Sequence, residues 1–243
     1  MIVMYHGIGG PDGVDPNEFV AQLELLHARR TVIPLRELGN ALSDPEASDL
    51  AAVTFDDGYV DFAELAMPTL RKLQMHATLF VPAGRIGESN IWDSGERPMR
   101  RIMDERELRD LDPEVVEIGG HGFSHCRMSG LPTNALERET ADCRRVLEDT
   151  LGRAVELFAY PYGQRDDFDS AAEKAVEQAG FSLACSTCFG RNNHEAGRYR
   201  LNRVGIEPSD DLTAVASKFD GAYDWVRWKE KAGYRLRGIR QRL

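Results

Sequence analysis

The stretch Ala51-Ala-Val-Thr-Phe-Asp-Asp-Gly58 decides the fold class, because five uncharged residues run directly into two carboxylates and a glycine. Such a run predicts a strand buried on both faces, and Asp-Asp-Gly predicts a tight turn at its end. Two other predicted strands lead into polar residues: 115–118 precedes Gly119-Gly-His121, and 156–159 precedes Tyr160-Pro-Tyr-Gly163. Because parallel strands of α/β folds end on one active face, we expect the three groups to converge.

Strands and helices alternate along the rest of the chain. Short apolar runs predict strands, and apolar residues at helical spacing predict the helices between them. The strands are expected at 2–5, 31–34, 51–55, 77–81, 115–118, 156–159, 181–186 and 201–206, and the helices at 17–28, 62–73, 105–111, 134–151 and 170–179. This alternation predicts an α/β protein whose parallel sheet or barrel is covered by helices.

Length and composition restrict the classes that remain. The chain has 243 residues, of which 42% are hydrophobic and 29% charged, which suits one folded domain. Four cysteines are too few for a disulfide scaffold, and a net charge of -10 disfavours nucleic-acid binding. The beginning of the chain lacks the features of a signal peptide and no apolar run has membrane-spanning length, so we expect a cytoplasmic location.

The last nineteen residues differ in charge from everything before them. Residues 225–243 hold seven basic residues and one acid, interleaved with Trp225, Trp228 and Tyr234. We therefore divide the chain into a domain at 1–224 and a basic tail at 225–243. One interpretation is peripheral contact of the tail with an anionic membrane; the other is a terminal helix packed on the acidic domain.

The polar groups at the strand ends include the donors of a metal site. His121-Gly-Phe-Ser-His125 has a spacing that lets two imidazoles bind one zinc ion, and Asp57 is a natural third ligand. Asp56 would then be free to act as a base toward a bound water. Two histidines four residues apart are usually surface residues, and Asp-Asp-Gly is usually only a turn. Their occurrence together after apolar strands is what indicates a metal site.

Three motifs resemble those of one known family, the polysaccharide deacetylases (NodB homology, carbohydrate esterase family 4). These motifs are Thr54-Phe-Asp-Asp-Gly-Tyr59, His121-Gly-Phe-Ser-His125 and Phe158-Ala-Tyr-Pro-Tyr-Gly163. The resemblance covers roughly residues 1–207 and implies a single distorted (β/α) barrel with about seven strands. It also implies hydrolysis of acetyl groups on sugars with a divalent metal, most commonly zinc, with cobalt, nickel or manganese as the other candidates.

The resemblance also implies a role for each motif residue. Asp57, His121 and His125 would hold the metal, and Asp56 would be the general base. The backbone N–H of Tyr162 would stabilise the oxyanion, and Tyr160 and Pro161, in the third motif, would help to wall the substrate groove.

Three departures from the family pattern concern the same site. Ala159 stands where the family often has an arginine that contacts the base, and Arg203 or Arg165 could replace it. Gly122 replaces the usual serine or threonine of the second motif. The late Leu-x-His motif that carries the general acid is missing after residue 163.

His6 is the candidate for the missing acid. It follows the apolar strand 2–5, in the manner of the N-terminal histidine of the circularly permuted poly-N-acetylglucosamine deacetylases. In a closed barrel the first and last strands are neighbours, so such a permutation preserves the site. The alternative is a strand-end histidine that bonds to the backbone.

Three candidate functions are consistent with these motifs. The leading one is metal-dependent deacetylation of an N-acetylated amino sugar in an exopolysaccharide or glycoconjugate. The second is removal of a formyl group from a lipid-linked amino sugar. The third is a catalytically inactive carbohydrate-binding module, which the retained Asp56, Asp57, His121 and His125 disfavour.

Overall fold

The computed structural model describes residues 1–42, 44–93, 95, 98–192 and 197–222. The predicted basic tail at 225–243 lies outside these residues. Among the described residues, no helix combines the length and the apolar character needed to cross a membrane.

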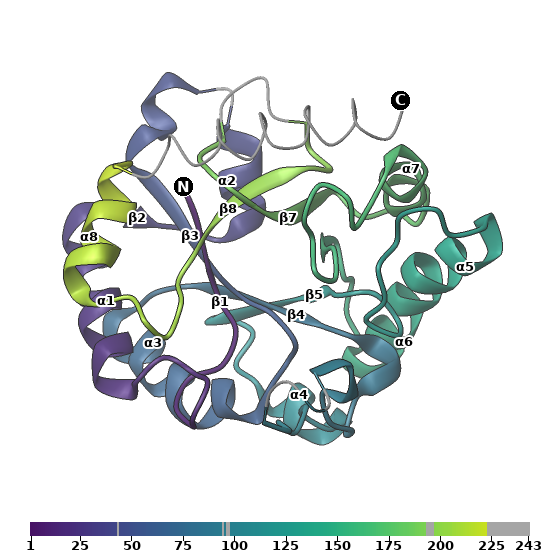
Figure 1. Cartoon of the computed structure of the whole chain (residues 1–243), viewed down its shortest axis with the longest axis horizontal. Coiled ribbons are helices and arrows are strands. Elements are labelled where there is room, and N and C mark those ends of the chain that lie inside the picture. The colour runs from purple at the N-terminus through teal and green to yellow at the C-terminus, as the bar shows by residue number, and fades with distance from the viewer. Residues whose placement is uncertain (43, 94, 96–97, 193–196, 223–243) are drawn as a thin grey trace.

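Seven parallel strands close into a barrel at the centre of the molecule (Figure 1). They are β1 (Ile2–Tyr5), β3 (Leu50–Phe55), β4 (Ala77–Val81), β5 (Val116–Gly120), β6 (Leu157–Ala159), β7 (Leu183–Phe189) and β8 (Leu201–Gly205). The ring closes because β1 pairs with β8 on one edge and with β3 on the other. A short strand, β2 (Thr31–Val32), adds to the start of β3. This confirms the expected single-domain, distorted (β/α)7-type barrel.

Barrel closure determines which strand ends meet. Tyr5 of β1 pairs with Phe55 of β3, and the Asp56 N–H donates to the Tyr5 carbonyl at 3.0 Å. Met4 pairs in turn with Gly205 of β8. The residues that follow β1, β3 and β8 therefore lie side by side, although β1 and β8 are about two hundred residues apart in the chain.

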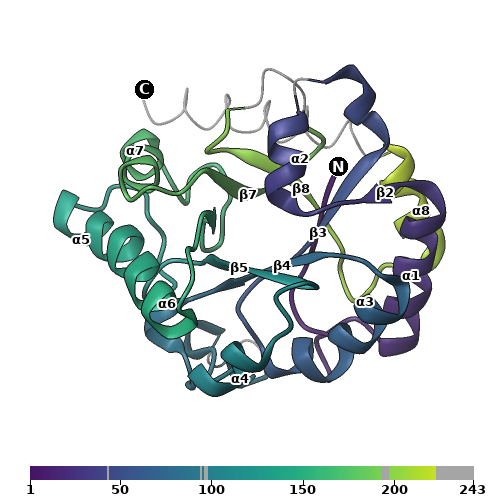
Figure 2. The same cartoon turned by 180° about the vertical axis from the view of Figure 1, so that it is seen from behind.

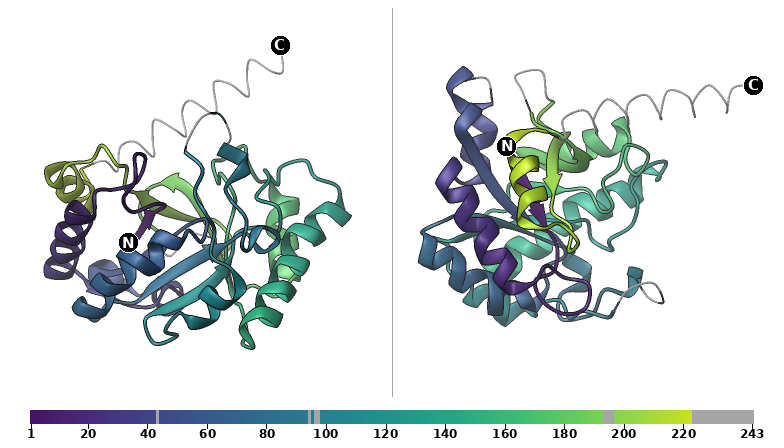
Figure 3. Two further views of the ribbon diagram at one scale, coloured as in Figure 1. Left: turned by 90° about the horizontal axis from the view of Figure 1, so that it is seen from below. Right: turned by 60° about the vertical axis from the view of Figure 1, so that its left-hand side comes forward.

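Helices surround the barrel (Figures 2 and 3). They are α1 (Pro16–Arg29), α2 (Leu35–Ala41), α3 (Met67–Leu73), α4 (Glu105–Asp110), α5 (Thr133–Glu137), α6 (Cys143–Leu151), α7 (Ser170–Gln178) and α8 (Leu212–Asp220). Shorter 3₁₀ turns occupy Pro45–Asp49, Ala83–Arg85 and Ile91–Asp93. In Figure 3, α8 (yellow) lies against α1 (purple), where Arg29 of α1 bonds to Asp220 at 2.7 Å. Helices α2 and α8 were not predicted from the sequence.

Two of the predicted helices are interrupted. The expected helix at 62–73 begins with a π-helical turn at Phe62–Ala66 before α3, and the one at 134–151 has a π-helical turn at Arg138–Asp142 between α5 and α6. A π turn makes room for one extra residue, and such turns are frequent at functional sites.

The core has two parts. Apolar side chains between the outer faces of the strands and the helices form the larger one. A smaller cluster fills the barrel with residues at alternate strand positions, such as Ile2, Ala52 and Leu183, and Leu35 and Leu38 of α2 pack on it. Figure 2 shows α2 across the rear of the barrel, so the opposite end is left for the polar residues that follow the strands.

Candidate metal and catalytic site

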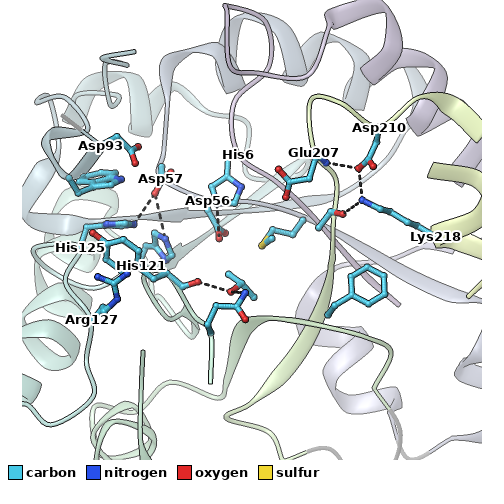
Figure 4. A pocket seen from close by; sticks show the side chains of 17 residues that line it. His6, Asp56, Asp57, Asp93, His121, His125, Arg127, Glu207, Asp210 and Lys218 are labelled. Atoms are coloured by element: carbon cyan, nitrogen blue, oxygen red, sulfur yellow. Dashed lines mark hydrogen bonds and ion pairs between the residues drawn. The ribbon is translucent and has the colours of Figure 1, made fainter. Parts of the chain in front are cut away.

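The residues that follow β1, β3, β5, β6 and β8 surround one pocket of about 750 Å³. Figure 4 shows the side chains that line it. Of the predicted site residues, the structure brings together His6, Asp56, Asp57, His121, His125 and Tyr162 as lining residues of this pocket. The expected convergence of the three strand ends is therefore observed.

Asp57, His121 and His125 form a cluster of possible metal ligands. Asp57 Oδ1 lies 3.5 Å from His121 Nε2 and 3.2 Å from His125 Nε2, and one donor atom of each residue lies within 4.8 Å of the other two. All three side chains are buried. Asp57 Oδ1 has no properly aligned hydrogen-bond donor among the described residues. One unsatisfied buried oxygen facing two imidazole nitrogens is a donor set that fits a divalent cation such as zinc.

The histidine tautomer agrees with a ligand role. His121 Nδ1 lies 2.8 Å from the Ala159 carbonyl, which only accepts, so Nδ1 carries the hydrogen and Nε2 presents a lone pair toward Asp57. Burial lowers the pKa of His121 to about 4, so this imidazole is neutral near pH 7. Burial by itself raises the pKa of Asp57, but the nearby imidazole of His125, with smaller effects of His6 and His121, outweighs it and holds that pKa below its usual range. Neutral imidazole and ionised carboxylate are the forms that bind metal.

The two histidines are held by a strained turn. His125 has a φ of 61° and Gly122 a φ of 72°, both in the left-handed region. The carboxylate of Glu139, in the π turn after α5, accepts hydrogen bonds from the N–H groups of Phe123 at 2.8 Å and Ser124 at 2.9 Å, and from the Ser124 hydroxyl at 2.7 Å. Glu139 is buried, so these bonds replace its lost hydration. Sequence reasoning missed this residue, because a glutamate inside a predicted helix carries no signal of its own.

An aromatic ring covers one of the histidines. Trp92 stacks on His125 with ring centroids 3.9 Å apart and 19° between the planes. The sequence is equally consistent with a place for Trp92 in the groove wall and with a plain packing role. The structure puts it at the pocket wall, in the 3₁₀ turn Ile91–Asp93.

Asp56 is held by an arginine from the last strand. Arg203 donates from Nη1 to Asp56 Oδ1 and from Nη2 to Asp56 Oδ2, both at 2.7 Å, and both side chains are buried. Burial raises the pKa of Asp56, but the charge of Arg203 more than offsets this, so the net pKa is below its usual value. Arg203 also bonds to the Ser186 carbonyl at 2.8 Å. Of the two candidates for the arginine missing at Ala159, Arg203 is the one that contacts Asp56.

His6 reaches the same carboxylate from β1. Its Nε2 lies 3.9 Å from Asp56 Oδ2, and 42% of its side chain is exposed. Figure 4 shows His6 beside Asp56, on the side that faces Glu207. The ring is therefore open to the pocket and close to the candidate base.

The third motif divides between the pocket and the core. Tyr162, with a φ of 59°, lines the pocket, and its ring lies 5.1 Å from that of His125. Tyr160 is fully buried, donates its hydroxyl hydrogen to the Tyr199 carbonyl at 3.1 Å and stacks on Phe168. Pro161 packs beside Gly122. Neither Tyr160 nor Pro161 is among the described residues that line the pocket, and Tyr160 turns instead toward Phe168 and Tyr199. Their expected place in the groove wall stays a prediction.

The fold is a closed seven-stranded parallel α/β barrel, and two aspartates and three histidines surround one pocket at its strand ends. The family model for polysaccharide deacetylases matches residues 43–184, and the chain belongs to this family. It is thus an enzyme of the class that acts on acylated carbohydrates.

Individual relatives agree with this assignment. The chain is 26% identical over 212 residues to YxkH of Bacillus subtilis (strain 168), named for the same family, with 85% of this chain and 71% of YxkH covered. Among solved structures, it is similar to the deacetylase PplD of Streptococcus pyogenes in complex with acetate (TM-score 0.75, 22% identity, 90% of this chain and 96% of that chain). It is also similar to IcaB of Ammonifex degensii (TM-score 0.76, 21% identity, with the same shares covered). These two structures support the fold.

Proposed function

We propose that this protein is a metal-dependent hydrolase that removes N-acetyl groups from amino sugars of an exopolysaccharide or glycoconjugate. The observation that carries the proposal is the convergence of Asp57 Oδ1, His121 Nε2 and His125 Nε2 beside Asp56, with His6 on the far side of that carboxylate. A binding module without catalysis has no need for this buried arrangement of acid, base and ligand groups.

Asp57, His121 and His125 would hold the cation, and their mixed oxygen and nitrogen donors favour zinc over magnesium or calcium. Cobalt, nickel and manganese remain the other candidates. A bound divalent cation supplies Lewis acidity, which makes water nucleophilic near neutral pH and stabilises developing negative charge.

Asp56 is assigned as the general base. Arg203 donates a hydrogen bond to each oxygen of the Asp56 carboxylate and so fixes the orientation of that group. The remaining lone pairs of these oxygens can accept the proton of the attacking water. The lowered pKa keeps Asp56 ionised across the neutral range, which is the form that a general base needs.

His6 is assigned as the general acid. The amine that leaves an amide must be protonated, and a protonated imidazole is a common general acid for such a step. The position of His6 beside Asp56 and its exposure to the pocket support this role.

The backbone N–H of Tyr162 is assigned to the oxyanion. The peptide that carries this N–H is held because its carbonyl, that of Pro161, accepts a hydrogen bond from the Gly163 N–H at 2.6 Å. A fixed donor of this kind lowers the barrier of comparable reactions by about 3 kcal/mol.

The test is acetate release from a panel of N-acetylated glycans, with formate measured in parallel. We expect the chelated protein to be inactive, added zinc to restore activity, and acetate rather than formate to be released. Formate release from an N-formylated, lipid-linked amino sugar would instead establish the deformylase alternative.

The matched variants are Asp56→Asn and, on the surface of α4, Asp110→Asn. Asp56→Asn is expected to bind zinc normally while turnover falls about 10²- to 10⁴-fold, the usual contribution of base catalysis. Asp110→Asn should behave as the unaltered protein. If the zinc-loaded protein releases neither acetate nor formate from any substrate of the panel, the enzyme proposal is contradicted.

A further inference from the structure

The glycine-rich loop that follows His6 wraps around one arginine side chain from a distant segment. Arg100 donates from Nε to Asp12 Oδ1 at 2.9 Å, and from Nη2 to the same oxygen at 2.6 Å and to the Gly9 carbonyl at 2.7 Å. Its Nη1 donates to Asp61 Oδ2. Only 12% of the Arg100 side chain is exposed, so the guanidinium forms a buried link between these groups.

The loop after His6 is rich in glycine, and this leaves room for the Arg100 guanidinium. A Cβ atom at Gly7 would lie 2.5 Å from Arg100 Cζ, and one at Gly13 would lie 2.7 Å from Arg100 Nη2. The loop is closed by a bond from Gly9 N–H to the Val14 carbonyl at 2.7 Å. The glycines therefore leave the space that the guanidinium fills, immediately after His6.

The backbone of Arg100 also bonds to the segment that carries Trp92, which lines the pocket. Its backbone N–H donates to Asn90 Oδ1, and the Asn90 N–H donates to the Arg100 carbonyl at 3.1 Å. Asn90 is buried and donates from Nδ2 to Asp93 Oδ2 at 3.0 Å. These bonds anchor the turn that carries Trp92, the residue that stacks on His125.

We propose that Arg100 is a positioning residue that sets the distance between His6 and the His125 side of the pocket. One guanidinium ties the loop after His6 to the turn that carries Trp92, with Asp61, next to the Asp56-Asp57 turn, as the third anchor. This inference rests on the acid role proposed for His6. Displacement by about 1 Å can cost on the order of 10²-fold in rate, so a small change in this link is measurable.

Lysine cannot replace this arginine, because an ammonium group lacks the planar fork that reaches two carboxylates and a carbonyl in fixed directions. We expect Arg100→Lys to lower kcat on an N-acetylated sugar about 10- to 100-fold. Zinc affinity should stay within about twofold, since none of the three candidate ligands contacts Arg100 in the described structure.

The matched control is the same substitution at the next residue, Arg101→Lys. The guanidinium of Arg101 pairs with Glu107 at the surface. Asp12→Asn offers a milder second variant if Arg100→Lys is poorly folded.

A direct readout of position comes from the histidine ring resonances of the zinc-loaded protein. The chain has six histidines, so the His6 signal can be assigned by its loss in His6→Ala. Arg100→Lys and Asp12→Asn should shift the His6 signal and leave those of His27 and His76 in place, whereas Arg101→Lys should shift none. In the His6→Ala background, Arg100→Lys should add little further loss of kcat.

The outcomes separate the two proposals. A fall in kcat with an unmoved His6 signal, or an equal loss in the presence and absence of His6, overturns the positioning role. A shifted His6 signal together with normal turnover of His6→Ala supports the link and overturns only the proposed acid role of His6.

Discussion

Adjacent aspartates acquire different roles because the backbone turns between them. Asp57 adopts a φ of 72°, so its carboxylate faces the two histidines, whereas Asp56 extends from β3 toward Arg203. A left-handed conformation is rare for a residue with a side chain, and it persists only where the surroundings enforce it. The same strain at His125 and Tyr162 shows that the pocket is built from enforced local geometry.

Removal of Arg203 should strand a buried charge. Arg203→Met leaves the buried carboxylate of Asp56 without a positively charged partner. We therefore expect the free energy of unfolding to fall by about 3–5 kcal/mol. The control Arg101→Met breaks a surface pair with Glu107 and should cost at most about 1 kcal/mol. Urea unfolding of both variants provides the measurement.

A second variant shows whether the stranded charge is the cause. Arg203→Met combined with Asp56→Asn removes both charges, so much of the lost stability should return. Equal destabilisation by Arg203→Met and Arg101→Met would show that the buried pair has no special role.

Glu139 should control zinc affinity without contacting the metal. In Glu139→Gln, an amide NH₂ replaces one oxygen that accepts hydrogen bonds from the histidine turn, so the turn loses part of its support. We expect zinc affinity to fall about 10- to 100-fold, as is typical when groups that orient metal ligands are altered. Competition with a fluorescent chelator measures this. Glu137→Gln, which is exposed on the preceding turn, should leave the affinity unchanged; equal affinities in the two variants would remove the role of Glu139.

At the scale of elements, the two π turns explain where helix prediction departed from the structure. The apolar spacing over 134–151 indicated one continuous helix, but Arg138–Asp142 widens into a π turn that carries Glu139 to the histidine turn. The turn Phe62–Ala66 likewise begins directly after Asp61, which bonds to the Ile8 N–H at 3.1 Å and to Arg100. Both helices therefore give up regular α-helical bonding next to residues that hold the pocket loops.

The histidine turn requires glycine at position 122, where the family usually has serine or threonine. A Cβ atom there would lie 3.0 Å from Glu139 Oε2 and 3.0 Å from Pro161 Cγ, in a backbone with a φ of 72°. We expect Gly122→Ser to lower the free energy of unfolding by about 1–2 kcal/mol or more, and to weaken zinc binding.

Gly130 provides the matched control for this prediction. It has a φ of 71°, but a Cβ atom there would meet nothing within 4 Å. Gly130→Ser should therefore show the conformational cost alone, with normal zinc affinity. If the two variants bind zinc equally well, crowding at Gly122 is not important for the site.

At the scale of the whole molecule, barrel closure connects the site to overall stability. The three candidate ligands follow β3 and β5, which β4 separates in the sheet, so a cation held there would link the ends of two strands that do not pair with each other. A ligand that binds only the folded state stabilises it by about 2.7 kcal/mol at a hundred times its dissociation constant.

Zinc should accordingly raise the unfolding temperature by roughly 5–10 °C at that concentration. Differential scanning calorimetry with and without chelator measures the shift. Asp57→Asn should abolish it, while Asp110→Asn should retain it. A shift that persists in Asp57→Asn would place the zinc elsewhere.

The strands, their alternation with helices and the identity of the motif residues were predictable from the chain, because these signals depend on spacing within a few residues. Asp57, His121 and His125 were predicted from motifs, and the structure brings them together. The partners of these residues became known from the three-dimensional fold. Arg203 meets Asp56 across 147 positions, and Arg100 meets Asp12 across 88. Such contacts arise from the closure of the barrel and the packing of its loops, and no local pattern in the chain encodes them.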